Sequence, residues 1–233
     1  MKNSRITLLG IGMVLILTGV SSASAQSNRN WPQWLAHYYQ APQADQVVTA
    51  VFALSRSGYF EGDGQPATAI GFLSVVFAEN PEKVDGWMAE FRNLPVAHQR
   101  LVASALWYSG LPSGDRQLRV LAVDSSPEIR REVEQMLGLG VTAVSKTPVL
   151  SEASLNLQWG AFLASGDQQH IVNALAALGS GEARLSVAAR TTLAEKAASH
   201  QRVYEICQAQ LARQPAKVRD QIQTALASVK TLP

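Results

Sequence analysis

Residues able to do chemistry are scattered along this chain rather than grouped in a recognisable motif. Four histidines lie far apart in the sequence, at His37, His98, His170 and His200. A zinc protease needs two histidines on one helix face with a glutamate between them, and a serine nucleophile needs an adjacent base, as in G-x-S-x-G or S-x-x-K. Neither arrangement occurs, and Ser109 is read as a helix-end residue. The sequence therefore predicts no catalytic residue, no cofactor and no metal ligand.

Two glutamates keep an enzymatic function open. Enzymes that cleave glycosidic bonds use a carboxyl group whose pKa is raised in an apolar cleft. Glu79 follows Phe77 and Ala78, and Glu90 precedes Phe91, so both acids are candidates by proximity to apolar residues. Acids beside apolar residues on a helix usually face solvent, which favours a structural interpretation of both.

Aromatic side chains near the predicted mature N-terminus form the best candidate binding surface. Trp31, Trp34 and Tyr38 share one face of a short predicted helix, and such rings supply large contact areas for a partner. Tyr59 and Phe60 lie in a glycine-rich loop and would add contacts if they are exposed. We take these five residues as candidate partner-binding residues. The alternative is that the first helix docks on its neighbours and hides its rings, because an isolated helix of about ten residues is unstable.

Helices must position these residues, because apolar residues recur at helical rather than strand spacing. Val84, Trp87, Met88 and Phe91 form an i, i+3, i+4, i+7 stripe, and similar stripes recur along the chain. Short connections between amphipathic helices favour antiparallel neighbours, so we expect an all-α fold of stacked antiparallel helical hairpins, an irregular α-solenoid. The predicted helices are 31–40, 43–57, 66–79, 81–93, 95–109, 115–124, 127–137, 151–165, 167–178, 183–198, 200–213 and 216–230.

Residues typical of helix ends agree with this assignment. Asn80 and Ser126 each precede a proline, which places a capping residue before the first helical position. Gly58, Gly110 and Gly166 lie where helix ends need a left-handed residue.

The segment 138–150 divides the predicted helices into two groups. It contains two glycines, a proline and one charge, and it has no helical stripe. We therefore expect an N-terminal helical half at 26–137, a connection at 138–150 and a C-terminal helical half at 151–233. Whether the two halves form one domain or two is left open at this point.

The segment 1–25 is typical of a cleaved secretory signal peptide. Lys2 and Arg5 precede an apolar run at 6–20, and Ala23 and Ala25 flank a serine at the predicted cleavage site. The run of 15 residues is shorter than the ~20 that a bilayer-spanning helix needs. Cleavage after Ala25 would release a bacterial periplasmic or secreted chain without an integral membrane segment.

Charge and cysteine content narrow the expected partners. Loss of the two signal-peptide charges lowers the formal net charge from +2 to zero and leaves no dense cluster of either sign, so nucleic acid is not an expected partner.

Cys207 is the only cysteine, so no internal disulfide can form. Its helical spacing predicts a buried side chain, whereas an intermolecular disulfide or reactive thiol would require exposure.

Three segments, GFLSVVFAENP at 71–81, ALWYSG at 105–110 and LQWGAFLASG at 157–166, resemble an uncharacterised family of exported bacterial helical-repeat proteins. More broadly, the chain is similar to tetratricopeptide and Sel1-type arrays, although no 34-residue period is present. That resemblance implies a protein-binding scaffold and brings no catalytic residues.

Two functions follow from these observations. The preferred hypothesis is a non-enzymatic exported scaffold that binds an envelope protein or peptide. The alternative is a peptidoglycan-directed envelope hydrolase. A deep pocket with convergent carboxylate or histidine groups would favour the hydrolase, whereas a shallow apolar groove would favour the scaffold.

Overall fold

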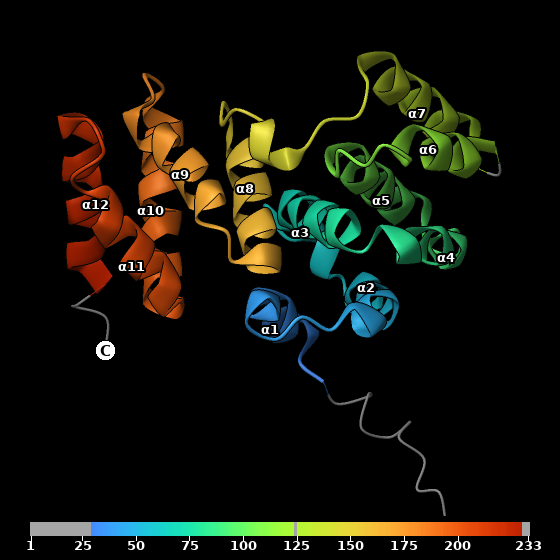
Figure 1. Cartoon of the computed structure of the whole chain (residues 1–233), viewed down its shortest axis with the longest axis horizontal. Helices are drawn as coiled ribbons and strands as arrows, with labels where there is room; N and C mark the ends of the chain where they lie inside the picture. Colours follow the sequence, from blue (N-terminus) through green and yellow to red (C-terminus); the bar gives the residue numbers. More distant parts are fainter. Residues whose placement is uncertain (1–28, 124, 230–233) are drawn as a thin grey trace, which may run out of the picture. The chain divides into compact units, whose positions relative to one another are not determined.

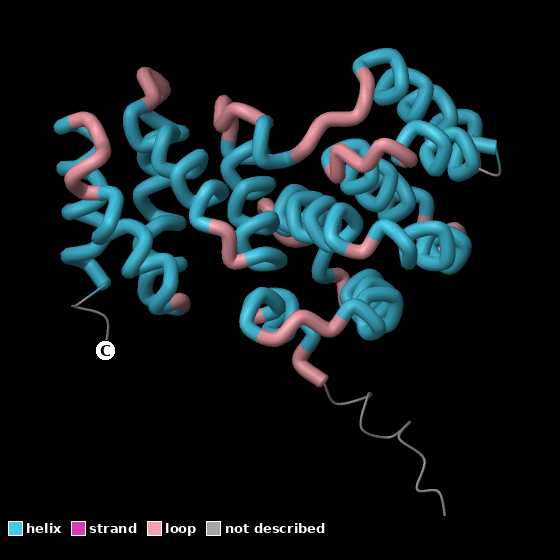
Figure 2. The backbone as a smooth tube through the Cα atoms, viewed as in Figure 1, coloured by secondary structure: helices cyan, strands magenta, loops and turns pink. Residues whose placement is uncertain are grey.

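The computed structural model describes residues 29–123 and 125–229, and this part of the chain is all-α, as predicted (Figure 1). No strand occurs in the described ranges, where helices alternate with short loops (Figure 2). The predicted signal peptide at 1–25 lies outside them. The helices are α1 (Trp31–Ala36), α2 (Val47–Arg56), α3 (Gln65–Glu79), α4 (Pro81–Phe91), α5 (Val96–Tyr108), α6 (Gly114–Val123), α7 (Pro127–Leu139), α8 (Glu152–Ser165), α9 (Gln168–Ala176), α10 (Ala183–Ser199), α11 (Gln201–Gln210) and α12 (Ala216–Val229).

Each predicted helix has a counterpart, and the differences lie at helix ends. Short 3₁₀ segments at Tyr38–Gln40, Ala44–Gln46 and Ala177–Gly179 replace α-helix where we expected continuous helices. A further 3₁₀ turn, Tyr59–Glu61, lies in the loop before α3. None of the helices in the described part of the chain has the length and apolar composition needed to cross a membrane.

The two predicted N-caps behave differently. The Ser126 hydroxyl accepts a hydrogen bond from the Ile129 amide, as expected for the residue before the start of α7. Asn80 occupies the N-cap position of α4 before Pro81, as predicted, but its side chain makes no hydrogen bond to an α4 amide. Its Nδ2 donates instead to the Val76 carbonyl oxygen at 2.9 Å, because the C-terminal carbonyls of α3 need donors as much as the α4 amides need acceptors.

The core is centred on the close packing of α3 against α8. A Cβ atom added to Gly71 would lie 2.0 Å from the Leu157 carbonyl oxygen, and one added to Gly160 would lie 1.9 Å from the Thr68 carbonyl oxygen. Only glycine allows two helix backbones to approach this closely. Since α3 precedes the segment 138–150 and α8 follows it, helices from both sides of that segment share one core. The described helices from Trp31 onward form one compact unit.

The segment 138–150 is attached to both groups of helices. The Thr142 amide donates to the Trp107 carbonyl oxygen at 3.0 Å, and Ala143 forms an isolated antiparallel bridge with Ser109. Val144 begins a 3₁₀ turn, and its side chain is buried in the core. Backbone hydrogen bonds and apolar burial therefore hold this connection at the ends of α5 and α8.

Cys207 is fully buried in α11, in agreement with the packing interpretation. Burial raises the pKa of its thiol to about 12, so the reactive thiolate is scarce at neutral pH. We expect the native protein to resist alkylation by iodoacetamide at pH 8 and to be modified once it is unfolded in urea. Mass spectrometry after timed exposure measures both rates, and equal rates would contradict burial.

Candidate functional site

The rings at the start of α1 are docked on the core. Trp31 and Tyr38 are buried, and Trp34 is half-buried. The Trp34 ring makes edge contacts with Trp31, Tyr38 and Phe72, with its centroid 5.9 Å from that of Phe72. This is the docked arrangement, in which the rings stabilise the fold and leave little surface for a partner.

The loop pair, Tyr59 and Phe60, is also packed. Phe60 is buried, and its centroid lies 5.1 Å from that of His98 in an edge-on contact. Tyr59 is half-buried, and burial raises the pKa of its hydroxyl. The five aromatic residues proposed from sequence therefore do not form one exposed surface.

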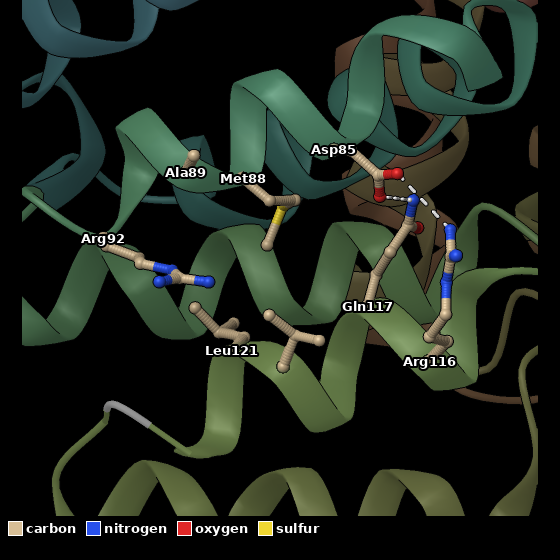
Figure 3. A pocket seen from close by; sticks show the side chains of 8 residues that line it. Asp85, Met88, Ala89, Arg92, Arg116, Gln117 and Leu121 are labelled. Atoms are coloured by element: carbon tan, nitrogen blue, oxygen red, sulfur yellow. Dashed lines mark hydrogen bonds and ion pairs between the residues drawn. The ribbon is translucent and has the colours of Figure 1, made fainter.

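A different surface, the groove between α4 and α6, is open. It has a volume of about 250 Å³ and is lined by apolar groups of Met88, Ala89, Val120 and Leu121 (Figure 3). Val120 remains 47 % exposed, although its neighbour Leu121 is buried. The α4–α6 groove thus presents apolar surface to solvent between two helices whose other faces pack in the core.

Charged and polar groups lie at the ends of the α4–α6 groove. Arg92 lies at one end, and Asp85, Arg116 and Gln117 gather at the other (Figure 3). Asp85 accepts hydrogen bonds from Gln117 Nε2 at 2.8 Å and from Arg116 at 3.3 Å. The groove lining therefore combines apolar side chains with two arginines and one carboxylate.

Gln117 leaves one hydrogen-bonding group unused. Gln117 is only 5 % exposed, and its buried Oε1 atom has no hydrogen-bond partner in the described part of the chain. A buried acceptor without a donor is costly, by roughly 1–3 kcal/mol. The oxygen is enclosed by protein atoms, so this cost belongs to the packing of α6 and not to the surface of the groove.

A second cavity, of about 200 Å³, lies among α3, α5, α8, α9 and the segment 143–145. We call it the polar pocket. Its polar lining residues are Ser74, Glu79, Tyr108, Ser109, Ser145, Ser165, Asp167 and His170. The described residues contain no group of three His, Cys, Asp or Glu side chains placed to hold a metal ion.

A hydrogen-bond network fixes the tautomer of His170. The Gln158 amide Nε2 donates to the carbonyl oxygens of Val144 at 2.8 Å and Thr147 at 3.1 Å, so Oε1 must face the other way. That oxygen lies 2.9 Å from His170 Nδ1. Since an amide oxygen only accepts, Nδ1 carries the proton and Nε2 carries the lone pair. Burial lowers the pKa of His170, which favours this neutral form.

The two glutamates proposed from sequence lie in different environments. Glu79 is the last residue of α3 and is exposed, but it lines the polar pocket, and partial desolvation by its surroundings raises the pKa of its carboxyl group. Glu90 is also exposed, on α4, and lines neither cavity. Folding therefore brings Glu79, Asp167 and His170 to one pocket and leaves Glu90 apart.

Family models, curated proteins and solved structures were compared with the chain, and none of them matches it. The α4–α6 groove was missed in the sequence analysis. One pattern could have indicated it: Val120 and Val123 lie off the buried stripe of Leu118, Leu121 and Ala122 on the same helix.

Proposed function

We propose that this chain is an exported interaction protein of the bacterial envelope that binds a peptide segment of a partner protein in the α4–α6 groove. In this proposal, an irregular α-solenoid of the kind expected from sequence serves as the scaffold, and no chemical step is required. The observation that carries it is an open apolar groove between two helices, with the exposed residues Ala89 and Val120 in its lining.

A peptide with an apolar side chain would cover the exposed apolar surface of the groove. Such a side chain would remove Ala89 and Val120 from water, gaining about 25 cal/mol for each Å² of apolar surface buried. The favoured partner is therefore a segment with an apolar side chain that fits between α4 and α6.

Exposed apolar surface beyond the groove extends the same face. Val123, at the end of α6, is 70 % exposed. Val120 and Val123 are three residues apart and lie on neighbouring positions of the helix surface. Together with the groove, they provide the apolar strip that an amphipathic partner segment needs.

The variant Val120→Glu tests this proposal. A carboxylate placed against the apolar side chain of a bound peptide should lower affinity at least tenfold, and the exposed position should leave stability within about 0.5 kcal/mol of wild type. The measurement is the Kd of peptides selected from a random library on the mature protein. We expect the selected peptides to share an apolar residue.

The matched control is Val187→Glu on α10, because Val187 is 51 % exposed and lies outside the groove. This variant should bind the selected peptides as wild type does. Equal affinities for the Val120→Glu and Val187→Glu proteins would place binding elsewhere and contradict the proposal.

One observation favours the second candidate, an envelope hydrolase acting on peptidoglycan. Glu79 lines the same cavity as His170, and partial desolvation raises the pKa of its carboxyl group, which is the direction that a general acid needs. If the protein is this hydrolase, Glu79→Gln abolishes release of muropeptides and Glu90→Gln does not. Absence of release from the wild-type protein removes this candidate and leaves the binding proposal unaffected.

A further inference from the structure

We propose that Ser55 is a nucleophile that takes the acyl group of a small carboxylic ester, with His98 as its general base and Glu61 positioning that base. The three side chains come from α2, α5 and the 3₁₀ turn Tyr59–Glu61. They line neither the α4–α6 groove nor the polar pocket, so this inference is independent of the proposed peptide partner.

Folding pairs Ser55 with a base that no local motif supplies. Ser55 Oγ lies 2.7 Å from His98 Nδ1, and His98 Nε2 lies 3.1 Å from a carboxylate oxygen of Glu61. Since a carboxylate only accepts, the proton of the neutral imidazole is on Nε2, and Nδ1 carries a lone pair. The Ser55 hydroxyl must therefore donate to Nδ1. A serine, an imidazole and an acid linked in this order can activate the hydroxyl for attack.

The hydroxyl of Ser55 is used differently from those of other serines in the helices. Ser74, Ser165 and Ser199 each donate to a backbone carbonyl oxygen three or four residues earlier, as serines in helices commonly do. Ser55 makes no such bond among the described residues, and its hydrogen bond is to His98 instead. Its proton is therefore already directed at a base.

The base is held in place from two sides. His98 is 7 % exposed, and the buried Phe60 ring meets its ring edge-on at a centroid distance of 5.1 Å. Gly58, with a φ of +74°, reverses the chain after α2, and its carbonyl oxygen accepts from the Glu61 amide at 3.2 Å. This turn places the Glu61 carboxylate against the imidazole. Ser55 is only half-buried, so a small ester can reach it from the surface.

The reaction is an acyl transfer to water in two steps. Ser55 Oγ bonds to the ester carbonyl carbon as its proton passes to His98 Nδ1, and the alcohol then leaves with that proton. Water attacks the acyl-serine and gives a proton to Nδ1, and Ser55 recovers this proton as the acid departs. Negative charge on the carbonyl oxygen needs donors. The first turn of α5 offers the amides of Val96 and Ala97, which have no acceptor among the described residues.

Diisopropyl fluorophosphate tests the nucleophile, because a serine that attacks its phosphorus expels fluoride and keeps the phosphoryl group. We expect peptide mass spectrometry to locate the adduct on Ser55, formed at least tenfold faster than on Ser57. Ser57 is the matched control, since it is exposed and its hydroxyl donates to the Leu54 carbonyl oxygen at 3.0 Å. No adduct on Ser55, or equal rates at the two serines, would overturn the proposal.

Hydrolysis of p-nitrophenyl acetate tests turnover. Ser55→Ala should lower the rate at least tenfold, whereas Ser57→Ala should leave it unchanged, and circular dichroism should show the same helix content in both variants. A wild-type protein that hydrolyses the ester no faster than Ser55→Ala would contradict a catalytic serine.

Glu61→Gln tests the positioning residue. The Glu61 side chain is 60 % exposed, so solvent screens its charge, and we expect the adduct on Ser55 to form about threefold more slowly. The midpoint of the pH profile of this rate should also move to lower pH, because the carboxylate no longer stabilises the imidazolium. Glu90→Gln should change neither quantity. An unchanged rate and midpoint in Glu61→Gln would overturn the three-residue site.

Discussion

Replacing Gly160 with alanine is expected to lower the free energy of unfolding by roughly 3 kcal/mol. The added Cβ atom would lie 1.9 Å from the Thr68 carbonyl oxygen and 2.8 Å from the Phe72 amide nitrogen, both backbone atoms of α3. Neither can move aside as a side chain would, so α3 and α8 must separate. Alanine favours helix by roughly 1 kcal/mol over glycine, which is too little to compensate. Urea denaturation measures the change.

Gly86→Ala provides the matched control. Gly86 lies in α4, is exposed, and has no atom within 4 Å of an added Cβ. The same change should therefore stabilise the protein by about 0.5–1 kcal/mol through helix propensity alone. If Gly160→Ala were as stable as wild type, the close contact between α3 and α8 would not exist in solution.

Acidification should destabilise the protein because of His200. This residue is buried beside Tyr39 and His37, with its ring centroid 4.9 Å from that of His37. Burial, and then the charges of His37 and Lys196, lower its pKa from 6.5 to about 4. As the pH falls below 6.5, His200 therefore becomes protonated in the unfolded chain at a higher pH than in the folded chain. Stability is lost as the pH falls from 6.5 to about 4, by about 3 kcal/mol at most.

The measurement is the free energy of unfolding between pH 7 and pH 4, in wild type and in His200→Gln. The variant lacks the imidazole that titrates. Over this pH range its unfolding should therefore take up close to one proton fewer than unfolding of the wild type, and its free energy of unfolding should depend less steeply on pH. Other groups contribute as well, since burial also lowers the pKa of His170. Identical pH slopes for the two proteins would show that His200 is not the group responsible.

The helices could be predicted because each carries its own periodic stripe and its own end residues. Ser126 and Gly166 show this well: Ser126 caps α7, and Gly166 ends α8 with a φ of +67°. Asn80 shows the limit of such reasoning. It stands at the N-cap position of α4, as the sequence predicts, but its side chain donates to the Val76 carbonyl oxygen of α3 instead of accepting from an α4 amide.

The candidate sites depend on contacts between helices, which no local pattern encodes. The α4–α6 groove combines residues about 30 positions apart, and Gln117 is left with an unpartnered oxygen only because Asp85 engages its amide nitrogen. In the polar pocket, Glu79 and His170 come from opposite sides of the segment 138–150. Both acids of interest looked alike in sequence, and packing alone separates Glu79 from Glu90.

The aromatic residues near the N-terminus formed a local pattern that predicted a binding site where the structure has a packed core. Trp31 and Tyr38 have the composition of a binding surface, but such rings stabilise a core equally well. Trp34 and Tyr38 contact Phe72, so the rings of this segment dock α1 and the following 3₁₀ turn on the core. Whether such rings bind a partner or pack in the core depends on their exposure, and exposure cannot be read from composition.

Site-specific photocrosslinking in the native envelope tests the binding proposal most directly. A photoreactive benzoylphenylalanine replaces Ala89, an exposed residue of the α4–α6 groove, and in a second protein it replaces Val187. We expect irradiation to join position 89 to one discrete envelope protein, through a segment with an apolar side chain, and to give no such product at position 187. The same product at both positions, or none at position 89, would contradict a partner-binding role for the groove.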